Sequence, residues 1–362
     1  MDSTKLTVDV PYPIRVEPGS LAHAGDFVRE LAPAHRYAII TDSHVGPIYA
    51  NRVAEAIGVA SADILAVPSG EASKTRGSWG WLTDHLIERG FGRDSAMIAL
   101  GGGVVGDLAG FVAATYMRGI PIIHLPTTLL AMIDSAIGGK TGVDTLMGKN
   151  LVGAFHQPAG VLIDPQTLET LPLSELRTGF AEALKHGVIG DRGYFDSVVR
   201  AIPSVLYDQR KAGDSLTGVI VGSIEIKSRI VARDEYEGGL RKILNFGHTV
   251  AHAIELLSGY SIAHGEAVAI GMTLESRLAE KAGFAKAGTA DEIRSALVAA
   301  GLPVKLPGGM TADRMMEVML ADKKARAGSV RYALPRTIGE MAGRESGWTV
   351  SVDDAIVREV LI

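Results

Sequence analysis

Residues 96–110 read Ala-Met-Ile-Ala-Leu-Gly-Gly-Gly-Val-Val-Gly-Asp-Leu-Ala-Gly, and this stretch decides the fold. Its apolar start predicts a buried strand, and Gly101, Gly103 and Gly106 fit the pattern G-x-G-x-x-G between that strand and a helix. Backbone N–H groups at such a helix start can hold a pyrophosphate. The same glycines could instead serve a tight turn that packs the helix against the strand, so this motif alone leaves dinucleotide binding open.

The same alternation of strand and helix extends along the first half of the chain. We expect buried strands at residues 36–41, 64–67, 121–125 and 161–163, and helices at 47–57, 75–89, 104–116 and 128–135. This order predicts a parallel sheet with helices on both faces. Residues 6–10 and 14–16 predict an antiparallel hairpin at the edge of that sheet.

The sequence pattern changes after Leu171-Pro172, where helical patterns replace the alternation of strands and helices. Helices are expected at residues 174–187, 216–233, 246–257, 266–281, 291–300 and 311–320, with one later strand at 330–334. We therefore predict an α/β domain over residues 1–172 and a mostly α-helical domain over residues 173–362.

The composition restricts the class of protein. With 362 residues, 47% hydrophobic and 21% charged, the chain is typical of a globular protein with two domains. Lys+Arg 36 against Asp+Glu 41 gives a net charge of −5, which argues against a nucleic-acid partner. The sequence has 0 Cys, so any metal needs His, Asp or Glu ligands. No signal peptide or membrane-spanning stretch is apparent, so we expect a cytoplasmic protein without a membrane partner.

Two further glycine-lysine motifs are typical of phosphate binding. They are Gly138-Gly139-Lys140-Thr141 and Gly148-Lys149-Asn150, in which a backbone nest would stand beside a cation. Either lysine could instead be a solvated loop charge. A carboxylate for a ribose is missing from its usual place about 20 residues after the glycine-rich loop, so Asp42 and Glu71 are the candidates.

Histidines and carboxylates cluster in the second half. Glu182, Lys185 and His186 share one face of an expected helix, and His248 and His252 are spaced i, i+4. An i, i+4 pair can bind one metal, with Glu182 supplying an oxygen. The spacing does not decide which two of His248, His252 and His264 would be ligands.

Cations recur along the same helices and could bind an anionic substrate or mark a solvated face. They are Lys185, Lys227, Arg241, Lys323 and Lys324.

Taken together, the motifs resemble the 3-dehydroquinate synthase family of the sugar phosphate cyclases, over nearly the whole chain. Those of the first half are Ser-Gly-Glu-Ala-Ser-Lys (69–74), Gly-Gly-Gly-Val-Val-Gly-Asp (101–107), Tyr-Met-Arg-Gly (116–119), Pro-Thr-Thr-Leu-Leu (126–130), Gly-Gly-Lys-Thr (138–141), Gly-Lys-Asn (148–150) and Gly-Ala-Phe-His-Gln-Pro (153–158). Those of the second half are Ala-Glu-Ala-Leu-Lys (181–185), Gly-Gly-Leu-Arg (238–241), Leu-Asn-Phe-Gly-His-Thr (244–249), His-Gly-Glu-Ala-Val (264–268) and Asp-Lys-Lys (322–324).

The resemblance implies a Rossmann-like N-terminal domain, a helical C-terminal domain and a homodimer. It implies bound NAD and a divalent metal, zinc or cobalt. The family converts 3-deoxy-D-arabino-heptulosonate 7-phosphate to 3-dehydroquinate in the shikimate pathway, which leads to chorismate and the aromatic amino acids. A hydroxyl is oxidised, phosphate is eliminated, the ketone is reduced back and an aldol step closes the ring.

The resemblance also implies roles for individual residues. The metal ligands are Glu182, His248 and His264. The NAD contacts are Asp42, Ser69, Gly70, Glu71, Lys74, Gly103, Val104, Val105, Gly106, Asp107, Thr127, Thr128, Lys140, Lys149, Thr167, Leu168, Glu169 and Thr170. The substrate and catalytic residues are Asp134, Lys140, Asn150, Lys185, Lys227, Arg241, Asn245, His252 and one or both of Lys323 and Lys324, with Arg118 reaching the neighbouring subunit's site.

Three positions depart from the common pattern of the family: Asp144, Ala251 and Tyr236. None of them has an implied catalytic role. The alternatives are another sugar phosphate cyclase, a metal-dependent NAD polyol dehydrogenase and an inactive ligand-binding relative. Gly-Gly-Lys-Thr and His252 favour the dehydroquinate enzyme over the related cyclases.

Overall fold

The chain forms two compact units, Met1–Pro172 and Leu173–Ile362. The structure, a computed structural model, describes residues 4–6, 8–58, 60, 63–145, 147–207, 213–321 and 330–361. Each unit is described by itself below.

A seven-stranded sheet forms the centre of the first unit, in the order β1-β2-β9-β6-β5-β3-β4. Its strands are β1 (Thr4–Leu6), β2 (Ile14–Val16), β3 (Arg36–Asp42), β4 (Ile64–Val67), β5 (Ser95–Gly101), β6 (Ile122–Pro126) and β9 (Gly160–Ile163). All neighbours pair in parallel except β1 and β2, which are antiparallel. The parallel sheet is confirmed, and the edge hairpin pairs residues 4–6, instead of 6–10, with 14–16.

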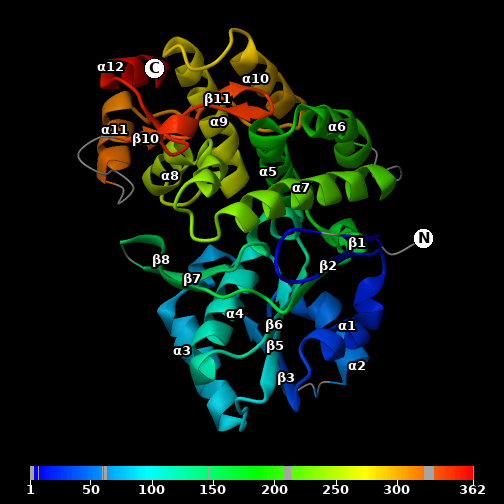
Figure 1. The fold of residues 1–362 in the computed structure, drawn as a ribbon. Coiled ribbons are helices and arrows are strands. Elements are labelled where there is room, and N and C mark those ends of the chain that lie inside the picture. The colour runs from blue at the N-terminus through cyan, green and yellow to red at the C-terminus, as the bar shows by residue number, and fades with distance from the viewer. Residues whose placement is uncertain are drawn as a thin grey trace. The chain divides into compact units, whose positions relative to one another are not determined.

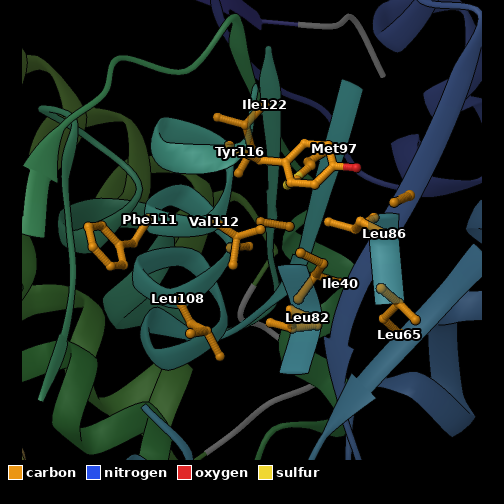
Figure 2. Close-up of a cluster of buried hydrophobic side chains, with 14 of the residues drawn as sticks. Ile40, Leu65, Leu82, Leu86, Met97, Leu108, Phe111, Val112, Tyr116 and Ile122 are labelled. Atoms are coloured by element: carbon orange, nitrogen blue, oxygen red, sulfur yellow. The ribbon is translucent and has the colours of Figure 1, made fainter. Parts of the chain in front are cut away.

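Helices cover both faces of this sheet (Figure 1). They are α1 (Ala24–Leu31), α2 (Asn51–Ile57), α3 (Arg76–Glu88) and α4 (Gly103–Thr115). Alternate residues of β3 face opposite sides: Ile40 packs with α3 and α4, whereas Ile39 packs with α1 and α2. Figure 2 shows the first of these cores, where Leu82 of α3 and Leu108 of α4 lie near Ile40.

The chain leaves neighbouring strands in opposite directions along the sheet. After β3 it continues to β4 on one side, and after β5 it continues to β6 on the other. The carboxyl ends of β3 and β5 therefore border a topological switch point, where open α/β sheets bind their ligands. The glycine-rich loop at residues 101–106 lies at this end of β5.

A hairpin that the sequence did not predict packs on α4. It pairs β7 (Lys140–Thr145) with β8 (Gly148–Phe155). The strands approach closely, because a Cβ on Gly153 would lie 2.1 Å from the carbonyl oxygen of Thr141. Glycine and charged residues are poor strand formers, so tertiary packing overrides the local preference here.

The second unit is mostly helical, as expected. Its helices are α5 (Leu173–Gly190), α6 (Arg192–Ile202), α7 (Gly213–Arg233), α8 (His248–Leu257), α9 (His264–Lys281), α10 (Thr289–Ala299), α11 (Ala312–Ala321) and α12 (Asp354–Val360). Short strands pair β10 (Arg331–Tyr332) with β13 (Val350–Ser351), and β11 (Pro335–Thr337) with β12 (Glu340–Met341). The strand expected at 330–334 is thus shorter than predicted, and α6 and α12 were not predicted.

No helix in the described part of the chain has both the length and the apolar composition that crossing a membrane requires.

Candidate active site

The start of α4 offers backbone N–H groups at the switch point of the first unit. Gly102 precedes the helix and supplies no side-chain cap, so the first-turn N–H groups are not capped by it. A Cβ on Gly102 would lie 3.1 Å from Cγ2 of Thr128, and one on Gly103 would lie 3.1 Å from Oγ of Ser135. Glycine therefore allows the loop to lie close to the segment that follows β6.

A buried lysine stands beside this loop. Lys74 Nζ lies 2.8 Å from Asp107 Oδ2, 3.5 Å from Glu71 Oε1 and 4.0 Å from Asp144 Oδ1. Burial alone would lower the pKa of Lys74, but the three carboxylates outweigh burial and raise it above its ordinary value. The second lysine of this group, Lys149, lies 3.7 Å from Glu71 Oε1.

Asp144 connects this group to the β7–β8 hairpin. Its Oδ1 accepts the backbone N–H of Asn150 at 2.8 Å, and its own N–H donates to the carbonyl of Lys74 at 2.7 Å. Asn150 has a φ of 55°, a left-handed conformation that this hydrogen bond helps to hold. The departure at Asp144 thus places a carboxylate between two predicted contacts, Lys74 and Asn150.

The other predicted nucleotide contacts follow strand ends of the same sheet. Asp42 ends β3, and its Oδ1 accepts the N–H groups of His44 and Val45 at 2.8 and 2.9 Å. Thr127 follows β6 and donates its backbone N–H to the carbonyl of Gly101. Ser69 and Gly70 follow β4, and residues 167–170 lie in a short 3-10 helix, η7 (Pro165–Thr170).

The remaining predicted residues of the first unit lie on three segments. Asp134 lies in the helical turn η6 (Ala131–Ser135), and Lys140 begins β7. Arg118 has a φ of 68° and follows Met117 at 50°, so two successive residues adopt the left-handed conformation.

In the second unit, three predicted metal ligands come together from three helices. Glu182 lies on α5, His248 begins α8 and His264 begins α9. Oε1 of Glu182 lies 3.7 Å from Nε2 of His248 and 3.6 Å from Nε2 of His264. Ligand atoms about 2.1 Å from one tetrahedral metal lie about 3.4 Å apart, so these residues fit a divalent ion.

The ring of each histidine is oriented by an oxygen atom next to its Nδ1. Nδ1 of His248 lies 3.2 Å from the carbonyl oxygen of Phe246, and Nδ1 of His264 lies 3.2 Å from Glu255 Oε1. An imidazole protonated at Nδ1 donates to these oxygens and turns the Nε2 lone pair toward Glu182. Sequence reasoning missed Glu255, although a carboxylate within the apolar helix HTVAHAIELL was a signal.

The protonation of these histidines reflects their charged neighbours. Burial and the charge of Lys185 hold the pKa of His248 well below its ordinary value. Burial also works against a charge on His264, yet Glu182 and Glu255 outweigh burial and raise its pKa to about 9. Without metal, His264 therefore carries a proton that a bound metal would replace.

His252 lies one turn after His248 and outside the trio. The two rings are 5.6 Å apart at nearly a right angle. A second buried carboxylate that sequence reasoning missed, Glu275, accepts the N–H groups of Gly247 and Val250 and so fixes the start of α8. This contact positions both His248 and His252.

Three predicted cations of this unit, Lys185, Lys227 and Arg241, are buried, which is unusual for charged groups. Lys185 contacts Oε2 of Glu182, Lys227 lies on α7, and Arg241 lies in η10 (Leu240–Asn245), which ends at Asn245. Lys323 and Lys324 lie outside the described residues.

The loop before η10 is organised by Asp234, which sequence reasoning also missed. Its carboxylate accepts the backbone N–H of Arg241 at 2.9 Å and those of Gly238 and Gly239. Burial alone would raise the pKa of Asp234, but these three donors hold it below its ordinary value. Asp234 thus fixes the position of the Arg241 backbone.

Two family models together cover most of the chain. The one described as 3-dehydroquinate synthase N-terminal matches residues 64–178, and the one described as 3-dehydroquinate synthase C-terminal matches residues 179–325.

Among solved structures, a 2-deoxy-scyllo-inosose synthase complexed with carbaglucose-6-phosphate, NAD+ and Co2+ has a TM-score of 0.88 and 26% identity, covering 99% of each chain. The 2-epi-5-epi-valiolone synthase of Streptomyces hygroscopicus, with NAD+ and Zn2+ bound, has a TM-score of 0.85 and 30% identity, covering 97% of this chain and 96% of that one.

Sequence relatives are closer. The 3-dehydroquinate synthase of Geobacter metallireducens is 47% identical over 334 residues, 91% of this chain and 92% of the relative. That of Synechococcus sp. is 44% identical over 347 residues, 94% of each chain. With both halves matched and this identity extending over nine-tenths of its length, the chain belongs to the 3-dehydroquinate synthase family.

Proposed function

We propose that the chain converts 3-deoxy-D-arabino-heptulosonate 7-phosphate to 3-dehydroquinate and inorganic phosphate. One observation carries this proposal: Glu182, His248 and His264 converge beside a buried lysine, in a chain 47% identical to a 3-dehydroquinate synthase over 91% of its length. Two histidines and a carboxylate suit a divalent metal with open positions for substrate oxygens. The lysine suits an anionic substrate.

We infer that Glu182, His248 and His264 hold zinc or cobalt and that the switch point holds NAD. The complexes of the neighbouring synthases with NAD+ and Co2+ or Zn2+ support this inference. When bound, NAD and the metal supply the transient oxidation of one substrate hydroxyl and the polarisation of its oxygen.

The first unit would bind the nucleotide through hydrogen-bond donors and a positive charge for its pyrophosphate, and through a carboxylate for a ribose. The N–H groups that begin α4, together with the buried ammonium of Lys74, suit the pyrophosphate. The carboxylate of Asp42, at the end of β3, suits a ribose hydroxyl. The remaining nucleotide contacts implied by the resemblance follow the neighbouring strand ends, as described above.

The substrate carries a phosphate and a carboxylate, and we assign these to cations that the resemblance implies. Lys185, Lys227 and Arg241 are buried, so their pairing with substrate anions is weakly screened. Lys140, Asn150, Asp134 and Asn245 complete the proposed substrate contacts. We assign proton transfer to His252, because its imidazole lies next to the proposed metal ligand His248 without belonging to the trio.

The reaction can be tested by following phosphate and NADH together, with substoichiometric NAD and added Zn2+ or Co2+. A synthase returns the hydride to its substrate, so phosphate accumulates over many turnovers while the absorbance of NADH stays flat after any initial transient. The variant His248→Ala serves as the inactive control, and Glu317→Gln, an exposed change on α11, serves as the matched control.

The alternatives predict other outcomes. Stoichiometric NADH without phosphate would replace the proposal with a polyol dehydrogenase. Turnover of a different sugar phosphate, with none of the heptulosonate phosphate, would replace it with another cyclase. Binding without turnover would indicate an inactive relative.

We also propose that the chain is a cytoplasmic homodimer in which Arg118 reaches the partner's site. Exposed apolar side chains next to Arg118 and on β8 support a self-association surface: Met117 is 39% exposed, and Leu151 and Phe155 on β8 are 42% and 45% exposed. The ring nitrogen Nε2 of His156 lies 3.0 Å from the carbonyl oxygen of Ile120, so β8 ends beside the segment that carries Arg118.

Subunit complementation tests this arrangement. Arg118→Ala and His248→Ala are each expected to be inactive, but mixed dimers would regain activity, because one site then receives an intact arginine from the partner and keeps its own histidine. Sedimentation gives the oligomeric state. A monomer, or mixed dimers without activity, would contradict the proposal.

A further inference from the structure

A pocket of about 470 Å³ lies within the helical unit, apart from the residues assigned above. Neither the metal trio nor Lys185, Lys227 or Arg241 lines it. Its apolar lining comes from α5, α7, η10 and β12, through the buried side chains of Ile189, Ile226, Ile230, Ile243 and Met341. A cavity of this size is within the range that holds a small organic molecule.

Four arginines also line this pocket: Arg229, Arg233, Arg336 and Arg344. Arg336 lies 3.4 Å from Glu340, but within the described chain the other three have no hydrogen bond or ion pair to a protein group. Two glutamates, Glu340 and Glu345, also line the pocket, so the four arginines outnumber the anions in the lining. Guanidinium groups suit carboxylates and phosphates, which they can bind through two parallel hydrogen bonds.

One wall of the pocket is the aromatic side chain of Trp348, which lies on a loop that hydrogen bonds hold in place. Trp348 lines the pocket with a φ of 66°, and its backbone N–H donates to the carbonyl of Gly343 at 2.7 Å. Arg331 also holds this loop, because its guanidinium donates hydrogen bonds to Oγ1 of Thr349 at 2.8 Å and to the carbonyl of Ser346 at 2.9 Å. A non-glycine residue in this conformation is uncommon and persists because the surrounding contacts hold it.

A second wall of the pocket is also held in place by a backbone contact. Gly339, in the turn between β11 and β12, donates its N–H to the carbonyl of Val188 on α5 at 2.8 Å. Its φ of 89° and the 2.9 Å that would separate a Cβ from the N atom of Arg192 both favour glycine. The two walls are therefore formed before any ligand binds, which lowers the entropy cost of binding.

We propose that this pocket is a second binding site, for a small carboxylate or phosphate carried on an aromatic or alicyclic ring. The isoleucines and Trp348 would contact the ring, and Arg229, Arg233 and Arg344 would bind the acid group. The ligand needs both a ring and an acid group. An inorganic anion would leave the apolar side chains in contact with water, and a neutral ring would leave Arg229, Arg233 and Arg344 without an anionic partner.

Phenyl phosphate is a suitable probe, and Trp348 is its reporter. The chain has 3 Trp, and the other two, Trp79 and Trp81, lie on α3 of the first unit. In spectra of 15N-labelled protein, Trp348→Phe assigns the Trp348 indole signal. We expect phenyl phosphate to shift this signal saturably, with a Kd of about 1 mM or below, while the Trp79 and Trp81 signals stay in place.

Paired variants identify the pocket. R229Q/R233Q should weaken the probe tenfold or more, whereas Arg277→Gln, an exposed arginine on α9, should leave the affinity unchanged. If the double variant is misfolded by circular dichroism, Arg344→Gln is used in its place. Inorganic phosphate and benzyl alcohol should each bind more weakly than phenyl phosphate.

Three results would overturn the proposal. The first is an unmoved Trp348 signal at about 10 mM probe, above the expected dissociation constant. The second is equal affinity for inorganic phosphate and phenyl phosphate, which would remove the role of the ring. The third is a shift lost in Lys227→Met but kept in R229Q/R233Q, which would place the probe in the substrate site.

Discussion

Replacing Glu255 is expected to weaken metal binding while leaving all three proposed ligands in place. The side chain of Glu255 is 3% exposed, and its Oε1 lies 3.2 Å from Nδ1 of His264. In Glu255→Gln an amide oxygen can still accept that hydrogen bond, but the negative charge that makes the imidazole a stronger ligand is lost. In Glu255→Ala the acceptor is lost as well, so the ring of His264 is free to turn.

The magnitude follows from these two contributions. Loss of a partner behind a metal-bound histidine typically reduces metal affinity by about 10–100-fold. We expect about tenfold, or about 1.4 kcal/mol, for Glu255→Gln, which keeps the hydrogen bond. For Glu255→Ala, which loses both contributions, we expect about 100-fold, or about 2.8 kcal/mol.

Competition with a chromophoric chelator measures the zinc dissociation constant of each variant at one pH. Glu317→Gln, an exposed change on α11, controls for the loss of one negative charge from the same unit. Thermal unfolding followed by circular dichroism confirms that the metal-free variants are folded. If both Glu255 variants bind zinc as tightly as the wild type, the orientation of His264 does not depend on this carboxylate and the reasoning fails.

Three further predictions test other parts of the site and the fold. His248→Ala should lose bound metal, whereas His252→Ala should keep it and slow turnover about 100-fold or more; metal analysis that found His252→Ala empty would reverse the assignment. Lys140→Met should weaken a non-reactive phosphonate analogue by about 2 kcal/mol in calorimetry, since a charge-assisted contact is lost, and an unchanged affinity would place Lys140 outside the site. Burial and the neighbouring His156 lower the pKa of the buried His124 from 6.5 to about 4. The unfolded chain therefore binds more protons than the folded one between these values, and up to about 3 kcal/mol of stability is lost as the pH falls through this range. Urea unfolding at pH 7 and pH 5 should show a smaller loss for His124→Leu than for the wild type, and identical losses would refute this account.

The sequence by itself determined the elements whose signals are local. The apolar runs at β3, β5 and β6 lie between helical patterns, and the glycines after β5 mark a helix start. Because hydrophobic period and turn chemistry operate over a few residues, these elements follow from the chain alone. The order of motifs also indicated the family. The β7–β8 hairpin did not follow, because its glycine-rich strands form only where α4 packs against them.

The spacing of residues left open which histidines meet Glu182; the resemblance implied His248 and His264, and the tertiary structure brings these two to Glu182. Spacing places His248 and His252 on one face of α8 and says nothing about His264, so any two of the three satisfied the pattern. The choice depends on how the start of α9 packs near α8 and α5, which brings Nε2 of His264 to 3.6 Å from Oε1 of Glu182. The supporting carboxylate of Glu255 is likewise identified only by its contact with His264. Helical period fixes directions within one helix, whereas a ligand set drawn from three helices is set by their packing.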